Sequence, residues 1–145
     1  MKGNRIPDHD HIARYCRPTS IEDGQIQATA FMIRANEESL SVNWMEFLGR
    51  SNRAEEIAEI RRIYSSKFSR VGVNAKIAIL NVGYVRKKVL QESIDRRRLD
   101  VRHDPIISDG INDPSHSGIY NLRQDDELIA ELIVETIQET YQARI

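Results

Sequence analysis

The sequence predicts a single α+β domain: a mostly antiparallel sheet of about five short strands packed with two to three helices, including a long amphipathic C-terminal helix. Three observations lead to this fold class. Short apolar stretches alternate with turn residues, two segments carry apolar residues at helical spacing, and no repeat or Ser/Gly linker divides the 145 residues. We expect residues 1–10 to be a loose lead-in and residues 11–145 to form the domain.

The first half of the domain contains two predicted strands and one predicted helix. Residues 29–34 (TAFMIR) and 40–48 (LSVNWMEFL) have the composition of strands and are joined by a polar turn. The second strand mixes polar and apolar residues on both faces, which favours a place inside the sheet with some polar groups turned to a pocket. Residues 51–68 follow with apolar residues at helical spacing, and either Asn52 or Ser51 can serve as the N-cap.

The second half begins with a segment rich in Ile and Val, residues 74–85, which predicts a central strand. Residues 85–98 fit a helix or a strand. Residues 99–103 (LDVRH) and 117–122 (SGIYNL) predict short strands. Residues 125–145 start with three acids, which suit the positive end of a helix dipole, and continue with apolar residues at helical spacing. This last segment is the predicted long C-terminal helix.

Charge is distributed unevenly although the net charge is only −1. Residues 86–102 carry seven basic and three acidic side chains, whereas residues 124–145 carry six acids and a single base, Arg144. This pattern fits complementary solvated faces, and it also fits nucleic-acid or phosphate binding through residues 86–102. Aromatic residues barely interleave with these bases, which gives little support to stacking on single strands.

Composition excludes several classes of protein. The one cysteine rules out an internal disulfide and a thiolate-rich zinc site. No apolar run is long enough to span a membrane, and the first residues lack an apolar signal-peptide core, so we expect a cytoplasmic protein with no membrane contact. Glycine-rich phosphate loops are absent, which argues against nucleotide-triphosphate motors and Rossmann oxidoreductases.

The candidate catalytic residues are histidines with acidic neighbours, together with one thiol and one carboxylate. His103 and His116 lie near the ends of a loop rich in Pro, Gly and Asp, and His11 follows the acidic start of the chain. Two histidines can divide the roles of general acid and base. Cys16 has arginines beside it, which would favour the thiolate, although the sequence also fits Cys16 as an inert, half-buried small hydrophobe. Glu46 is a polar group in a predicted interior strand and needs a partner there.

The remaining candidates would hold a substrate or a metal. Arg14 and Arg17 are predicted anion clamps, and Trp44 is a predicted substrate contact. Asp104 and Asp113 could join the histidines around a divalent metal ion, although the spacing matches no established metal motif. Two further interpretations remain open: the loop is only a tight connection, or Arg14 pairs with the strand carboxylate in a structural polar cluster.

Two functions therefore compete at this point. The first is an accessory or regulatory interaction module that binds a protein partner through the acidic C-terminal segment, or nucleic acid through residues 86–102. The second is a small hydrolytic or group-transfer enzyme that acts on a phosphate- or nucleotide-containing substrate through a His/Asp site, with the thiol as a further nucleophile. Convergence of His11, His103 and His116 in one cleft would favour the enzyme.

Overall fold

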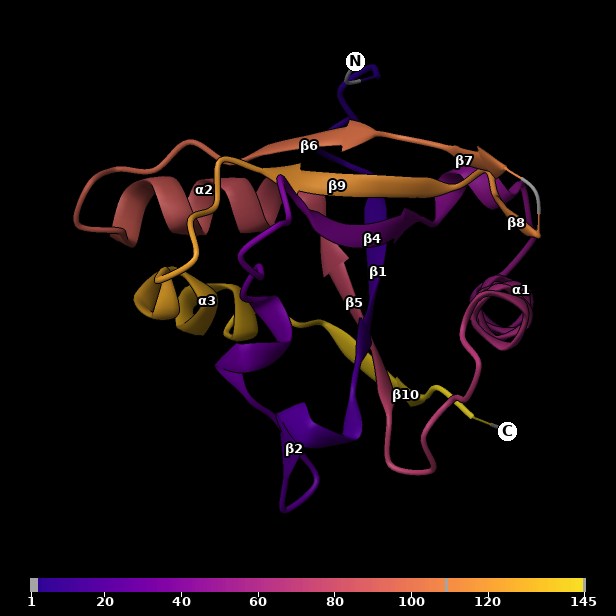
Figure 1. Ribbon diagram of the computed structural model, residues 1–145. Coiled ribbons are helices and arrows are strands. Elements are labelled where there is room, and N and C mark those ends of the chain that lie inside the picture. The colour runs from indigo at the N-terminus through magenta and orange to yellow at the C-terminus, as the bar shows by residue number, and fades with distance from the viewer. Residues whose placement is uncertain (1–2, 109, 145) are drawn as a thin grey trace.

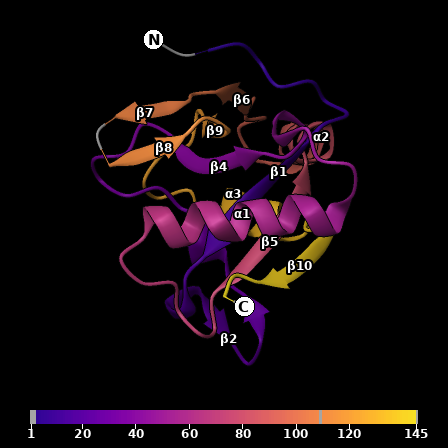
Figure 2. The same ribbon diagram turned by 90° about the vertical axis from the view of Figure 1, so that its right-hand side faces the viewer.

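The structure is a computed structural model that describes residues 3–108 and 110–144. An antiparallel sheet of six strands lies between helices on its two faces (Figures 1 and 2). Along the sheet the strands are β10 (Glu139–Gln142), β5 (Lys76–Asn81), β1 (His11–Cys16), β4 (Leu40–Trp44), β9 (His116–Tyr120) and β6 (Asp100–His103). Every neighbouring pair in this sheet is antiparallel.

Two small hairpins and three 3-10 helices complete the strand and turn structure described. The hairpins are β2 (Ile21–Glu22) with β3 (Gln25–Ile26), and β7 (Ile106–Ser108) with β8 (Ile111–Asp113). The 3-10 helices are η1 (Pro18–Ser20), η2 (Ala28–Phe31) and η3 (Glu46–Leu48).

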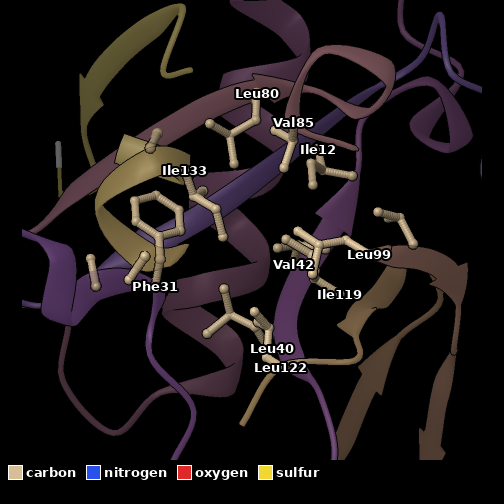
Figure 3. Packing of buried hydrophobic residues seen from close by; sticks show 14 of the residues in the cluster. Ile12, Phe31, Leu40, Val42, Leu80, Val85, Leu99, Ile119, Leu122 and Ile133 are labelled. Atoms are coloured by element: carbon tan, nitrogen blue, oxygen red, sulfur yellow. The ribbon is translucent and has the colours of Figure 1, made fainter. Parts of the chain in front are cut away.

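The α-helices cover both faces of the sheet and give the domain two hydrophobic cores. They are α1 (Arg53–Lys67), α2 (Val82–Glu92) and α3 (Glu127–Val134). The larger core joins α2, α3 and η2 to the sheet, with Phe31, Val85 and Ile133 meeting side chains of β1, β4, β5 and β9 (Figure 3). The smaller core places α1 on the opposite face. Burial of apolar surface on both faces is the main stabilising contribution expected for this architecture.

The N-caps of α1 and α2 follow from their sequences. The side chain of Asn52 accepts a hydrogen bond from the backbone N–H of Glu55 at 2.9 Å, which confirms Asn52 rather than Ser51 as the cap of α1. The sequence of residues 85–98 fits either a helix or a strand. In the structure, residues 85–92 belong to helix α2. Asn81 caps α2 by accepting from the N–H of Tyr84 at 2.8 Å.

The predicted fold class was wrong about the C-terminus, where no long amphipathic helix forms. Helix α3 has only 8 residues, and the chain then forms strand β10. The hydroxyl of Thr136 donates a hydrogen bond to the Ile133 carbonyl at 2.6 Å and so satisfies one of the carbonyl groups at the C-terminal end of α3. Residues 139–142 then pair with the outer edge of the buried strand β5, whose N–H and C=O groups need partners. Tertiary pairing therefore overrides the helical spacing.

Three predicted strands also differ from the structure. The strand predicted over residues 74–85 ends at Asn81, where helix α2 begins. Residues 29–34 contain the 3-10 helix η2 instead of a strand, because Ala30 and Phe31 are buried in the larger core. The strand predicted over residues 40–48 ends at Trp44, where the chain turns into η3. In contrast, β1 was not assigned to a strand from the sequence, although it lies inside the sheet.

The N-terminal segment differs from a loose lead-in over the residues that the structure describes. Gly3, Asn4 and Ile6 exchange backbone hydrogen bonds with Val101 and His103 of β6 at 2.9–3.1 Å. Ile6 is buried in the larger core. This segment therefore protects the free edge of β6.

Strands β1 and β4 separate part-way along their length, and this separation positions the candidate site. They pair only at Ile12 with Trp44 and at Ala13 with Asn43. Beyond these pairs β1 stays with β5 and β4 stays with β9. In the part of the chain that the structure describes, no helix is both long and apolar enough to cross a membrane.

Candidate functional site

The structure brings His11 and Glu46 together. The Nδ1 atom of His11 lies 2.7 Å from Oε2 of Glu46, and the His11 backbone N–H donates to Oε1 at 2.7 Å. Glu46 is therefore held by β1 from the first turn of η3. This His–carboxylate pair has the arrangement that orients an imidazole, but none of the larger cavities of the described chain includes either residue.

His103 lies in an aromatic cluster rather than beside His11. Its ring centroid is 5.2 Å from that of Trp44 and 4.7 Å from that of Phe47, and its Nε2 lies 2.7 Å from the Pro114 carbonyl oxygen. The indole N–H of Trp44 donates to Asp10 at 2.8 Å. Trp44, a predicted substrate contact, therefore anchors the N-terminal segment.

His116 occupies a third environment, where it is buried and hydrogen-bonded on both ring nitrogens. Nδ1 lies 2.8 Å from the Asp104 carbonyl oxygen, and Nε2 lies 3.2 Å from the Ser41 hydroxyl. Burial lowers the pKa of His116, and the hydrogen bond to the Asp104 carbonyl opposes that effect. The three histidines thus have separate hydrogen-bond partners in the structure.

Cys16 is fully buried in the larger core, where the predicted thiolate is not favoured. Burial raises the pKa of its thiol to about 12, and the nearby charge of Arg14 only partly opposes this. Of the two interpretations of Cys16, its burial fits the inert hydrophobe rather than the activated thiolate, because removal from water outweighs the attraction of the arginine charge. Cys16 packs as a small apolar residue.

The two aspartates predicted as metal ligands are engaged in protein contacts. Asp113 is fully buried and accepts from Asn43 at 2.8 Å and from the Lys67 ammonium at 3.1 Å. Asp104 accepts from the Tyr120 hydroxyl at 3.3 Å. Across residues 3–108 and 110–144, no three His, Cys, Asp or Glu side chains gather as metal ligands would.

A cavity opens where β1 and β4 separate. It has a volume of about 920 Å³ and is bounded by the ends of β1 and α1, the start of β4 and the loop of residues 68–74. Five of its lining side chains are cations and one is a carboxylate: Arg14, Arg17, Arg34, Lys67, Arg70 and Glu37. We call this cavity the β1–β4 cleft. It includes both predicted anion clamps, Arg14 and Arg17.

Arg14 is held in the space between the two strands. Its Nε donates to the Ala30 carbonyl at 2.8 Å and its Nη1 donates to the Ser41 carbonyl at 2.9 Å. Among residues 3–108 and 110–144, no carboxylate lies within ion-pair distance of this guanidinium, so the predicted pairing with Glu46 does not occur. Burial lowers the pKa of Arg14, yet a guanidinium stays charged in proteins. A fixed, unpaired cation in a partly desolvated place favours an anionic ligand.

The other arginines of the cleft are exposed at its mouth. Arg17, Arg34 and Arg70 form no ion pair with any carboxylate that the structure describes. Lys67 differs, because its charge is compensated by buried Asp113. The cationic character of the cleft thus comes from Arg14 of strand β1 and from Arg17, Arg34 and Arg70 of three separate loops.

The cleft also contains an aromatic group that the sequence did not single out. The rings of Tyr15, Tyr64 and Phe68 have centroids 4.6–5.6 Å apart. Spacing within α1 places Tyr64 on the apolar face of the helix, which is an ordinary core signal, so no pattern assigns Tyr64 to a site. Tyr64 is the residue whose hydroxyl is buried without a hydrogen-bond partner in the described chain.

No protein family model, no curated protein and no solved structure matches this chain.

The basic segment of residues 86–102 is a weaker anion surface than its composition suggests. Arg86, Lys88, Arg97 and Arg102 all form ion pairs with carboxylates of the same chain. Four of the seven positive charges are therefore compensated locally, and they stabilise the packing of neighbouring elements instead.

Proposed function

We propose that this protein is a binding module whose β1–β4 cleft takes a phosphate-bearing anion. The observation that carries this proposal is Arg14, a guanidinium fixed by two backbone carbonyls at the bottom of the cleft with no carboxylate partner among the described residues. Arg17, Arg34 and Arg70 extend the positive charge to the mouth. Arginine suits phosphate because its planar group donates two parallel hydrogen bonds.

Binding is favoured over catalysis because the candidate acid–base groups are not in this cleft. His11, His103 and His116 are held by other partners, and Cys16 is a protonated core thiol. The lining side chains of the cleft supply hydrogen-bond donors and cations. Donors and cations recognise an anion without needing to transfer a proton.

The experiment is titration of the protein with pyrophosphate by isothermal calorimetry at low and moderate salt. A variant with Arg17, Arg34 and Arg70 changed to Gln loses three exposed charges at the mouth and should bind at least about tenfold more weakly. Salt should weaken binding to the unmodified protein more than to this variant.

The matched control changes Lys87, Arg96 and Arg98 to Gln. These three exposed cations belong to residues 86–102, line no part of the β1–β4 cleft and have no ion-pair partner that the structure describes. The control has the same net charge as the cleft variant and should keep the affinity of the unmodified protein. Equal loss in both variants, or no binding of pyrophosphate at all, would contradict the proposal.

A second candidate function is docking of a basic protein segment at the groove between α2 and α3. Ile94 is 90% exposed and Leu128 is 63% exposed, and both line this groove of about 650 Å³. Asp125, Glu127 and Glu131 line it as well and have no ion-pair partner among the described residues. Apolar side chains surrounded by uncompensated acids favour a partner segment with Lys or Arg around an apolar residue.

An amphipathic peptide of Lys and Leu, labelled for fluorescence anisotropy, tests this second function. Changing Ile94 and Leu128 to Ser should weaken its binding, whereas changing Ile107, which is 78% exposed on β7, should leave binding unchanged. Equal effects of both changes would show that the groove is not the binding surface.

A further inference from the structure

Three cations of the β1–β4 cleft, Arg14, Arg17 and Arg34, lie where two cavities meet. A second cavity of about 410 Å³ extends toward η2 and shares Arg14, Arg17, Arg34 and Glu37 with the cleft. Tyr15 lines both cavities, and the cleft alone continues to Phe68 and the rest of the loop of residues 68–74. A ligand centred on the arginines can therefore extend beyond them, and free phosphate would fill only a small part of the space.

The charge of the cleft exceeds that of one phosphate group. Lys67 is compensated by Asp113 at 3.1 Å, which leaves four arginines and the carboxylate of Glu37 among the lining residues described. The net charge is about three positive, whereas one phosphate monoester carries roughly −1.5 to −2. Two linked phosphates match this charge more closely.

An aromatic wall lies next to the arginines. The rings of Tyr15 and Phe68 line the cleft with their centroids 4.6 Å apart, and both side chains are half-buried, so each has ring surface that a ligand can contact. Exposed Val73, from the loop after α1, adds apolar surface at the same opening. Planar bases stack on such rings.

The hydroxyl of Tyr64 is an unused donor at this site. Tyr64 lines the cleft with only 2% of its surface exposed, and its hydroxyl has no partner in the described chain. Burial raises the pKa of Tyr64, and the nearby charge of Arg14 acts in the opposite direction. The phenol therefore stays protonated and keeps a hydrogen-bond donor that no described residue uses.

We infer that the ligand of the β1–β4 cleft is a nucleoside diphosphate, with its phosphates on the arginines and its base against Tyr15 and Phe68. This inference rests on the proposed function, since it assigns the chemical class of the ligand to the same cleft. The phosphates supply the charge that the arginines require, and the base covers the aromatic wall.

The test compares pyrophosphate with ADP, GDP, CDP and UDP by isothermal calorimetry on the unmodified protein without divalent cations. At least one nucleoside diphosphate should bind about tenfold or more tightly than pyrophosphate, because the base adds stacking to the same phosphate contacts. Changing Phe68 to Leu keeps an apolar side chain but removes the ring. It should bring nucleoside diphosphate affinity close to that of pyrophosphate while leaving pyrophosphate affinity unchanged.

The outcomes separate this inference from the proposed function. Pyrophosphate binding with no gain from any base would overturn the nucleoside diphosphate and leave phosphate binding in place. A polyuridine oligonucleotide that binds more tightly than every nucleoside diphosphate would also overturn it, in favour of single-stranded nucleic acid. The comparison among ligands uses the unmodified protein, so a poorly folded Phe68→Leu variant would not prevent a decision.

Discussion

The unpartnered hydroxyl of Tyr64 predicts that removing it stabilises the protein. Burial of a hydroxyl without a hydrogen bond costs about 1–3 kcal/mol, and Tyr64 is 2% exposed with no partner described for its oxygen. The substitution Tyr64→Phe removes the hydroxyl and therefore this free-energy penalty, and it loses only the weak van der Waals contacts of one atom. We expect the free energy of unfolding to rise by about 1 kcal/mol, which corresponds to an increase in Tm of about 3 °C for a domain of this size.

The measurement is urea unfolding, with stability taken from the midpoint at an unchanged m-value. Tyr120→Phe is the matched control, because the Tyr120 hydroxyl donates to Asp104 at 3.3 Å and its loss should destabilise the protein by about 1 kcal/mol. The two variants should therefore move in opposite directions. If Tyr64→Phe destabilises the protein as much as the control does, the hydroxyl has a partner in the folded chain and the reasoning is refuted.

The same variant connects stability with function. If the Tyr64 hydroxyl donates to a phosphate oxygen, Tyr64→Phe should bind pyrophosphate about tenfold more weakly while being more stable. Higher stability of Tyr64→Phe with unchanged pyrophosphate affinity would show that the Tyr64 hydroxyl does not contact the ligand.

Three further predictions concern buried polar groups. The substitution Asp113→Ala should lower the free energy of unfolding by about 3 kcal/mol because it leaves the Lys67 ammonium unpaired, and Asp113→Asn should lower it by less. A loss below about 1 kcal/mol for Asp113→Ala in urea unfolding would contradict this. Cys16 should react with a thiol reagent at pH 8 only as fast as the protein unfolds, because the side chain is fully buried and this burial raises the pKa of the thiol to about 12; rapid labelling in native buffer is the opposing result. Burial lowers the pKa of His116, so the unfolded chain binds a proton at this residue at a higher pH than the folded chain does, and stability should fall as the pH drops below about 6.5. The substitution His116→Gln should flatten that part of the profile of stability against pH. An unchanged slope would exclude His116 as the source of this dependence.

The sequence by itself determined the local features of this protein. The apolar spacing and the cap at Asn52 identified α1, and the Ile- and Val-rich stretch identified β5, because these signals depend on neighbours within a few residues. Residue chemistry alone also singled out Arg14 and Arg17 as candidate anion contacts, and both line the β1–β4 cleft. These signals survive folding because they do not depend on which distant segments meet.

Only the tertiary structure decided the C-terminus and the site. Residues after Val134 have helical spacing, yet the open edge of β5 takes them as a strand, since buried backbone groups must be paired. Folding gives the three histidines separate hydrogen-bond partners and buries Cys16 in the larger core. Neither outcome could be read from the sequence near these residues. The cleft itself exists because β1 and β4 pair at two positions and then separate around Arg14, and the distances between such remote segments follow from packing of the whole domain rather than from any local pattern.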